Sequence, residues 1–146
     1  VKKGATTIWE RWDGIKPDGS FQATSMNSFN HYAYGAIGDW MYKTVAGINI
    51  DPKSPGYKKI LIAPQPGGDF KHAAAKFESL YGEISSAWKT DGDKFTLDVS
   101  IPANTTATVM LPASENAAIM EGGKDADGLT DLKKIKSPSK NKSFEL

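Results

Sequence analysis

The stretch KFTLDVSIP, Lys94 to Pro102, alternates apolar and polar side chains along its whole length. In an extended chain its apolar side chains all point to one side: Phe95, Leu97, Val99 and Ile101. Such a period of two is typical of a β-strand that buries one face and exposes the other. The stretch therefore predicts a strand that lies on a hydrophobic core.

Further short strands are predicted on both sides of this one. Alternation recurs in YGEISSAWKT, residues 81–90, and in TATVMLP, residues 106–112. The tripeptide DGD that precedes Lys94 is a strong hairpin signal. YKKILIAPQP, residues 57–66, and AAAKFESL, residues 73–80, also indicate strands. Several short strands separated by Gly, Pro and Asn turns predict an antiparallel β-sandwich.

A different period governs the chain before residue 48. Its apolar side chains repeat at intervals of three and four: Phe29, Tyr32, Ala33, Ala36, Ile37, Trp40, Met41, Thr44 and Val45. This spacing predicts a helix from Phe29 to Val45 with Gly47 at its C′ position. Three residues are candidates for the N-cap: Ser25, Asn27 and Ser28. Gly35 and Gly38 each weaken such a helix by about 1 kcal/mol relative to alanine, which indicates a second helix packed closely against it.

The change of period divides the sequence into two parts. We expect residues 1–47 to be a helical segment and residues 48–146 to be the sandwich, with a linker that contains Pro52 and Pro55. The fold class is thus mainly β, an antiparallel β-sandwich preceded by a helical segment. Residues 114–130, rich in Gly and Asp, are expected to form a long loop with turns between late strands.

The composition excludes several classes of protein. Hydrophobic residues make up 39% of the 146 residues, enough for a core, and the formal net charge is +1. A nucleic-acid-binding face would need a strong basic excess, and we expect the basic cluster at residues 132–142 to be a solvated loop. No stretch is apolar for long enough to span a membrane. The sequence has no cysteine, which excludes disulfides and thiolate metal sites.

The two histidines occupy different settings. His72 lies near the start of a predicted strand, and we assign it no role. His31 lies at the N-terminal end of the predicted helix, which favours a neutral imidazole able to hydrogen-bond a hydroxyl-rich ligand. A purely structural histidine is the alternative there. Neither a nucleophile motif nor a metal site is indicated, since DADG at residues 125–128 lacks the other ligands of a calcium loop, and no cofactor is expected.

One carboxylate has an unusual aromatic setting. In TTIWERWDG, residues 6–14, Glu10 lies between Trp9 and Trp12. Indole faces stack on sugar rings, and a carboxylate beside them is where a glycoside hydrolase keeps an acid, a base or a nucleophile. Glycoside hydrolysis needs a second carboxyl group, and no neighbouring acid has a comparable setting. In the alternative interpretation both indoles are core residues, and Glu10 pairs with Arg11 or another cation.

Longer motifs resemble a known enzyme family. GATTIWERWDG, residues 4–14, and SFQATSMNSFNHYAYGAIGDWMYKTVAGI, residues 20–48, closely resemble the end of the catalytic domain of bacterial α-L-rhamnosidases, glycoside hydrolase family seventy-eight. PGYKKILIAPQPGG, residues 55–68, resembles the opening of that family's C-terminal β-sandwich. The string Thr-Thr-x-Trp-Glu joined to Ser-x-Asn-His-x-x-x-Gly carries most of the specificity.

The resemblance implies an inverting enzyme on an α/α barrel that removes terminal α-L-rhamnose from glycosides. Glu10 falls on the family's general base, and His31 falls on a histidine that contacts the rhamnose hydroxyls. Trp9 and Trp12 are expected to form a wall of the sugar pocket. Residues 1–47 would then end the catalytic barrel, and the sandwich would stop before its final strand is complete.

The general acid of such an enzyme would lie upstream of this chain. We therefore expect the 146-residue chain alone to be inactive, and its N-terminus to be a cut within a longer protein. The helix, without its barrel neighbours, is expected to pack on the sandwich or on a second copy of the chain. The missing barrel of the parent protein is thus the expected partner, with rhamnose-containing glycosides as substrates.

Two other functions are compatible with these residues. A non-catalytic carbohydrate-binding or scaffolding sandwich would act through Trp88 or Tyr81. A different α/α-barrel glycosidase could carry the same tail, because a fold does not fix the sugar. For the parent protein, a secreted or periplasmic location is favoured over a cytoplasmic one.

Overall fold

The computed structural model describes residues 4–114, 116–130, 132–135 and 142–145. The chain divides into two compact units, Val1–Asp39 and Trp40–Leu146. They are called the N-terminal unit and the sandwich unit below.

The N-terminal unit is built mainly from turns and paired extended segments. One 3₁₀ turn, η1 (Thr24–Met26), is its first regular element. Two backbone hydrogen bonds of 2.8 Å pair the segment around Glu10 with the segment before the helix, from Glu10 N to Ser28 O and from His31 N to Ile8 O. The two segments that carry the predicted site residues are therefore held side by side.

A helix is present where the apolar spacing predicts one, but it begins at Tyr32 rather than at Phe29. The 3₁₀ turn η2 (Tyr32–Gly35) leads into α1 (Ala36–Trp40), which is followed by the π-helical turn η3 (Met41–Val45). The N-cap residue is His31, and its side chain makes no capping hydrogen bond. The predicted N-cap among Ser25, Asn27 and Ser28 is therefore wrong.

The late start has a cause in the segment pairing. A helix that began at Phe29 would use the carbonyls of Ser28 and Phe29 as its first acceptors. These carbonyls instead accept hydrogen bonds from Glu10 N and from the Thr7 hydroxyl. Pairing with the segment around Glu10 thus replaces the first helical turn.

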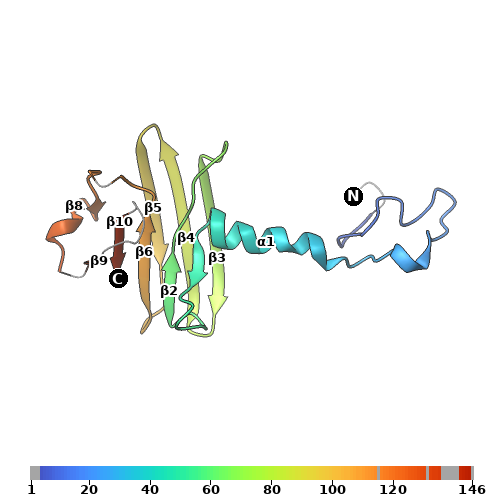
Figure 1. The fold of residues 1–146 in the computed structure, drawn as a ribbon, viewed down its shortest axis with the longest axis horizontal. Helices are drawn as coiled ribbons and strands as arrows, with labels where there is room; N and C mark the ends of the chain where they lie inside the picture. The colour runs from blue at the N-terminus through green and yellow to red at the C-terminus, as the bar shows by residue number, and fades with distance from the viewer. Residues whose placement is uncertain (1–3, 115, 131, 136–141, 146) are drawn as a thin grey trace. The chain divides into compact units, whose positions relative to one another are not determined.

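Among the described residues, two larger sheets and one two-stranded sheet form the strands of the sandwich unit (Figure 1). One has the strand order β1-β2-β6-β10-β9, with bounds β1 (Ile48–Ile50), β2 (Lys59–Ile62), β6 (Thr106–Leu111), β9 (Lys133–Ile135) and β10 (Lys142–Glu145). The other has the order β3-β4-β5, with bounds β3 (His72–Ser79), β4 (Gly82–Asp91) and β5 (Lys94–Ser100). The mainly β fold class is confirmed.

The hairpin predicted from DGD is confirmed. Strand β4 ends at Asp91 and β5 begins at Lys94, and these two residues pair across the turn. Gly92 takes a φ of +57°, a left-handed conformation that glycine adopts without a steric penalty. One sheet pairing departs from the antiparallel expectation, because β2 and β6 run parallel.

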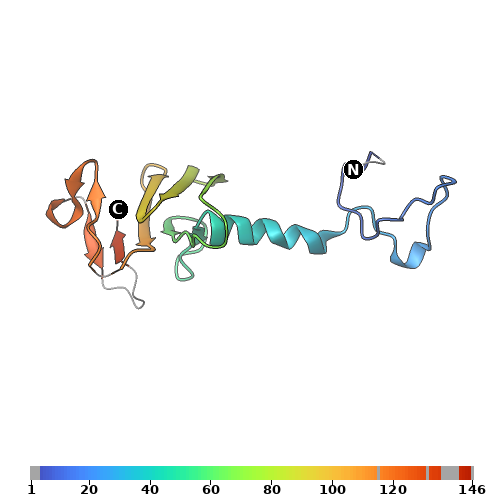
Figure 2. The same cartoon turned by 90° about the horizontal axis from the view of Figure 1, so that it is seen from above.

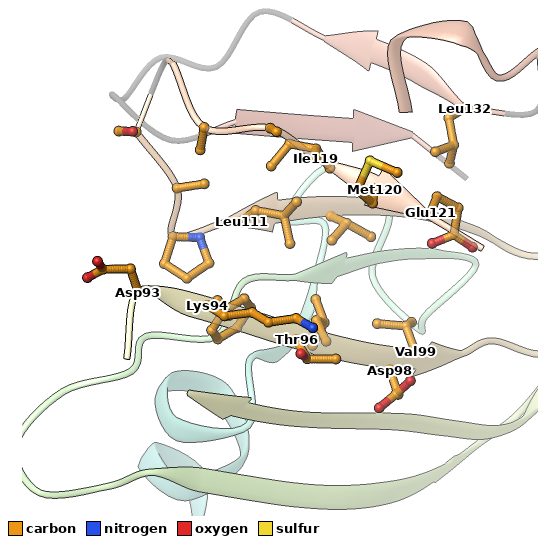
Figure 3. Close-up of a pocket in the computed structure, with 18 residues that line it drawn as sticks. Asp93, Lys94, Thr96, Asp98, Val99, Leu111, Ile119, Met120, Glu121 and Leu132 are labelled. Carbon is orange, nitrogen blue, oxygen red and sulfur yellow. The ribbon is translucent and has the colours of Figure 1, made fainter. Parts of the chain in front are cut away.

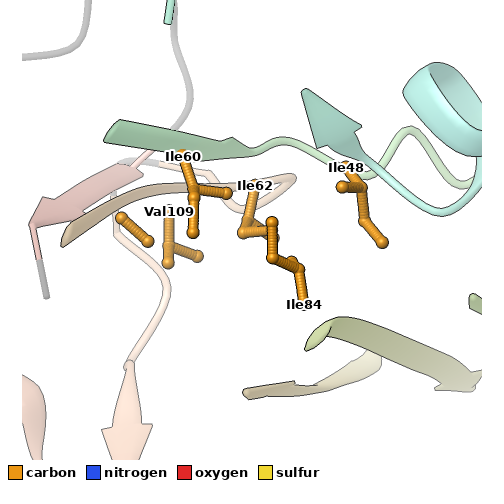
Figure 4. Packing of buried hydrophobic residues seen from close by; sticks show 6 residues of the cluster. Ile48, Ile60, Ile62, Ile84 and Val109 are labelled. Carbon is orange, nitrogen blue, oxygen red and sulfur yellow. The ribbon is translucent and has the colours of Figure 1, made fainter. Parts of the chain in front are cut away.

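The core lies between the two sheets. Its buried members are Ile48, Ile60, Ile62, Ile84, Ala107 and Val109. Figure 4 shows Ile60, Ile62 and Val109 of one sheet on the side that faces Ile84 of the other. Leu97 and Val99 of β5 pack against this cluster, as the alternation in β5 predicts. Burial of each large aliphatic side chain stabilises the fold by about 1.5–3 kcal/mol.

Two predictions for the C-terminal part are wrong. Residues 114–130, expected to be a loop, contain the hairpin of β7 (Met120–Glu121) and β8 (Lys124–Asp125) and the 3₁₀ turn η4 (Ala126–Gly128), in orange in Figure 2. The basic stretch at residues 132–142, expected to be a solvated loop, contains β9 and the first residue of β10; its residues 136–141 lie outside the described residues. Strand β10 pairs with the distant β6, a partnership that no local pattern reveals.

The end of the helix is bonded to the sandwich at five successive carbonyls. The pairs are Asn49 Nδ2 to Lys43 O (2.8 Å), Gln65 N to Thr44 O (3.0 Å), Trp88 Nε1 to Val45 O (2.6 Å), Ser86 Oγ to Ala46 O (2.7 Å) and Ala63 N to Gly47 O (2.8 Å). The last carbonyls of a helix lack donors within the helix. Here the sandwich supplies them, so the residues from Lys43 to Gly47 are fixed to it.

Gly47 is confirmed at the C′ position of the helix. Its φ is +83°, in the left-handed region that favours glycine. A Cβ atom at this position would lie 2.2 Å from the backbone nitrogen of Pro64, so no side chain fits there. Both the backbone conformation and the close approach of Pro64 require glycine.

Candidate functional site

Glu10 is held by two reciprocal hydrogen bonds to one residue. Its backbone N–H donates to Ser28 O over 2.8 Å, and Ser28 N donates to Glu10 Oε2 over 2.9 Å. The Glu10 side chain is 22% exposed, so it is neither sealed in a core nor free in solvent. A carboxylate anchored by one oxygen in this way has a fixed orientation and keeps access to solvent.

His31 lies next to this carboxylate. Its Nδ1 is 4.0 Å from Glu10 Oε2, and its side chain is 28% exposed. The imidazole also lies near two aromatic rings, with centroids 6.0 Å from Tyr32 and 5.7 Å from Tyr34. The two residues that the sequence singles out, 21 positions apart in the chain, are therefore brought together in space.

The alternative interpretation paired Glu10 with Arg11 or another cation, but in the structure Arg11 pairs with Asp13 instead. Its Nε lies 3.0 Å from Asp13 Oδ1, and Gln22 Nε2 donates to Asp13 Oδ2 over 2.9 Å. Hydrogen bonds from Gln22 and then from Arg11 hold the pKa of Asp13 below its usual value. Arg11 thus belongs to a small exposed cluster, and His31 is the basic residue beside Glu10.

The two tryptophans that flank Glu10 in sequence have different surroundings. The Trp9 ring packs edge-on against Phe29, with centroids 4.9 Å apart and an interplanar angle of 86°. The Trp12 side chain is 99% exposed. The interpretation of both indoles as core residues is therefore wrong for Trp12.

Asn27 and Gly14 support the site, and sequence reasoning missed this role. Asn27, expected as a possible helix cap, donates from Nδ2 to Gly14 O over 3.0 Å and is partly buried. Gly14 is buried, and a side chain there would displace the Asn27 amide, because a Cβ would lie 2.6 Å from Asn27 Oδ1. The contact joins residues 13 positions apart, so neither local period nor spacing signals it.

No metal-binding cluster of three or more His, Asp or Glu side chains occurs among the described residues. In the same part of the chain, no helix has the length and the apolar character that crossing a membrane requires.

The sandwich unit has a groove of about 920 Å³ beside β5 (Figure 3). Its charged lining residues are Asp93, Lys94, Asp98 and Glu121. Phe95 is the one aromatic residue among the described lining residues, and its ring already stacks on Trp88 at a centroid distance of 6.0 Å. The groove therefore offers no open aromatic platform for a sugar ring.

The residues that a carbohydrate-binding sandwich would use are differently placed. Trp88 is 3% exposed, and its indole N–H is bonded to Val45 O. Tyr81 is 46% exposed, with Lys58 Nζ 5.3 Å from its ring centroid. Trp88 acts as a core residue that binds the end of the helix, so a sugar contact through it is excluded.

Comparison with known proteins gives matches over both parts of the chain. Residues 1–45 match the bacterial α-L-rhamnosidase 6 hairpin glycosidase domain. Residues 47–126 match the bacterial α-L-rhamnosidase C-terminal domain.

Curated relatives carry the same enzyme name. An α-L-rhamnosidase of Streptomyces avermitilis is 52% identical over 113 residues, which covers 77% of this chain and 11% of that protein. One of Formosa agariphila is 40% identical over 137 residues, 94% of this chain and 15% of that protein. The chain thus spans between about a tenth and a sixth of the length of these relatives.

Solved structures agree with these matches. The crystal structure of Streptomyces avermitilis α-L-rhamnosidase complexed with L-rhamnose aligns with a TM-score of 0.69 at 41% identity, over 99% of this chain and 13% of that one. The α-L-rhamnosidase from Dictyoglumus thermophilum aligns with a TM-score of 0.73 at 30% identity, over 98% of this chain and 15% of that one. Residues 47–126, more than half of this chain, match the C-terminal domain of the family. This match shows that the chain belongs to the bacterial α-L-rhamnosidase family.

Proposed function

We propose that this chain forms the C-terminal part of an inverting α-L-rhamnosidase in which Glu10 is the general base. The enzyme name of the relatives supports the substrate class. The observation that carries the assignment is the partly exposed Glu10 carboxylate, fixed by Ser28 N and placed 4.0 Å from His31 Nδ1. A base needs an ionised, oriented carboxylate with access to water.

Each oxygen of Glu10 has a separate task in this proposal. Oε2 is anchored by the Ser28 amide. Oε1 accepts no hydrogen bond from the part of the chain that the structure describes, so it is available to a water molecule. That water attacks the anomeric carbon of rhamnose and gives its proton to Glu10, while the bond from this carbon to the leaving oxygen breaks.

The leaving oxygen needs a proton from a second carboxyl group. In inverting glycosidases the two carboxyl groups stand about 6.5–9.5 Å apart, which leaves room for the water. Because the stretches that align make up only 11% and 15% of the two relatives, we place the general acid in polypeptide outside these 146 residues. The chain alone then has no turnover.

His31 and the two tryptophans would bind the sugar. The imidazole of His31, ordered beside Tyr32 and Tyr34, can exchange hydrogen bonds with rhamnose hydroxyls. Trp12 presents its whole indole to a ligand, since it is 99% exposed. Together with Trp9 it would form a wall on which the apolar face of the sugar packs.

The rest of the catalytic barrel would cover the helix. Several large apolar side chains of residues 32–42 are more than 40% exposed: Tyr32, Tyr34, Ile37, Trp40, Met41 and Tyr42. A Cβ at Gly35 or Gly38 would meet nothing within 4 Å among the described residues. Bare apolar side chains and small residues on one helix are what a close helix neighbour requires.

Replacement of the base tests the proposal. In the full-length protein, Glu10→Gln keeps the size of the side chain and its acceptor oxygen but removes the proton-accepting carboxylate. We expect kcat on an aryl α-L-rhamnoside to fall by about 10²-fold or more, with KM largely kept. An unchanged kcat would remove Glu10 from the mechanism.

A further inference from the structure

The segment that carries Glu10 and the segment that carries His31 are fastened at several points. Beside the reciprocal bonds between Glu10 and Ser28, His31 N donates to Ile8 O. The Thr7 hydroxyl donates to Phe29 O. A side chain adds one more hydrogen bond between the two segments beyond Glu10, from Asn27 Nδ2 to Gly14 O over 3.0 Å.

Asn27 is the neighbour of the residue that orients the carboxylate. Ser28 N is the one described donor to Glu10 Oε2, and its position depends on where residue 27 is held. Asn27 is held by the Gly14 carbonyl, which also accepts a hydrogen bond of 3.0 Å from Gln22 N. The path from Gly14 through Asn27 to the Ser28 amide is therefore continuous and short.

Gly14 is required by this contact and not by its backbone conformation. Its φ does not fall in the left-handed region, unlike that of Gly19 or Gly47. An added Cβ would lie 2.6 Å from Asn27 Oδ1 and 3.2 Å from Phe29 Cε1. A side chain at residue 14 would thus displace the Asn27 amide and lengthen its hydrogen bond to Gly14 O.

We propose that Asn27 is a positioning residue for Glu10, acting through Gly14 O and the Ser28 amide. The inference rests on the proposed role of Glu10 as the base. Loss of the Asn27 amide donor frees the turn that carries Ser28 N, and the carboxylate loses its fixed direction. Misplacement of a catalytic group by about 1 Å can cost on the order of 10²-fold in rate.

The test uses the full-length protein and an aryl α-L-rhamnoside. We expect Asn27→Ala, and Asn27→Asp, which keeps the size but loses the donor, to lower kcat by about 10- to 100-fold with KM changed less than about threefold. Gln22→Ala is the matched control, because it removes an exposed amide donor to Asp13 from the same region. Its kcat stays within about twofold of the wild type.

A double-mutant cycle separates positioning from a general structural role. If Asn27 acts through Glu10, adding Asn27→Ala to Glu10→Gln causes no further loss of kcat. A loss of the same size in both backgrounds would overturn the inference, since it would show an effect on folding or binding. Gly14→Ala should likewise lower kcat in the wild type and have no added effect beside Asn27→Ala.

The outcomes distinguish this inference from the proposed function. An unchanged kcat for Asn27→Asp together with a large loss for Glu10→Gln overturns the positioning role and leaves the base in place. An unchanged kcat for Glu10→Gln overturns the assignment of the base itself. If Asn27→Ala fails to fold, the kcat of Asn27→Asp tests the positioning role instead, because aspartate preserves the volume of the side chain.

Discussion

At the scale of single residues, the site depends on which side chains lie beside each other. Glu10 has His31 beside it, whereas Arg11 is engaged by Asp13. The guanidinium and the base are adjacent in sequence but separate in their interactions. Sequence order alone therefore assigns the wrong side-chain neighbour to Glu10.

Arg11 provides a prediction at this scale. Because its salt bridge with Asp13 is exposed, Arg11→Ala in the full-length protein should change kcat by less than about twofold. Steady-state kinetics beside Glu10→Gln measure the difference. A loss from Arg11→Ala that approaches the loss from Glu10→Gln would show that the guanidinium serves the carboxylate after all.

The sequence predicted those site residues that lie in motifs, but not those whose role depends on contacts between distant loops. The motifs around Glu10 and His31 singled out both residues, and the structure brings them together. Asn27 and Gly14 gave no signal, because their contact joins two loops and has no period. The setting of Trp12 was equally hidden, since an indole beside an acid looks the same in sequence whether it is packed or exposed.

At the scale of elements, the joint between the helix and the sandwich is the strongest local feature. Five successive carbonyls find donors there, one of them the buried Trp88 indole. The period of two in β4 predicts an inward-facing Trp88. The hydrogen bond from the indole N–H to Val45 O could not be predicted, because it depends on tertiary packing.

Trp88→Phe tests this joint. The substitution keeps most of the apolar volume and leaves the Val45 carbonyl without its donor, so we expect a loss of about 1–3 kcal/mol in the free energy of unfolding. Urea unfolding of the 146-residue chain, followed by circular dichroism, measures it. Trp12→Phe is the matched control. Because Trp12 is 99% exposed, this substitution should change the free energy of unfolding by less than about 0.5 kcal/mol. Equal stabilities for the two variants would contradict the account of the joint.

The elements also show where sequence patterns stop. Alternation predicted β4, β5 and β6, because each buries one face on the core. The start of the helix and the parallel pairing of β2 with β6 depend on distant backbone partners, so no local pattern carries them.

At the scale of the whole molecule, the main feature is a helix that exposes large apolar side chains. Its large apolar residues from Tyr32 to Tyr42 remain more than 40% exposed, although the Tyr42 ring lies edge-on to the ring of Phe77. The match of residues 1–45 to a glycosidase domain supports a barrel of the parent protein as their natural neighbour. In isolation, the same residues favour contact with a second copy.

Self-association of the isolated chain is the expected result. Sedimentation of the 146-residue chain at micromolar concentration should show dimers or larger species. Ile37→Lys, a charge at a 58% exposed position, should shift it toward monomer. Lys16→Glu, a charge change at an exposed loop residue, serves as the control. A wild-type chain that stays monomeric would show that these side chains need no partner.

The central claim is that the Glu10 carboxylate activates water on the face of rhamnose opposite the leaving group. Azide needs no base, so it should replace the activated water in full-length Glu10→Ala acting on an aryl α-L-rhamnoside. Proton NMR should then detect recovered turnover and β-L-rhamnosyl azide, formed as nitrogen attacks the anomeric carbon and the aryl oxide leaves. Recovery of the α-configured azide, or no recovery by a variant that still binds L-rhamnose, would contradict the claim.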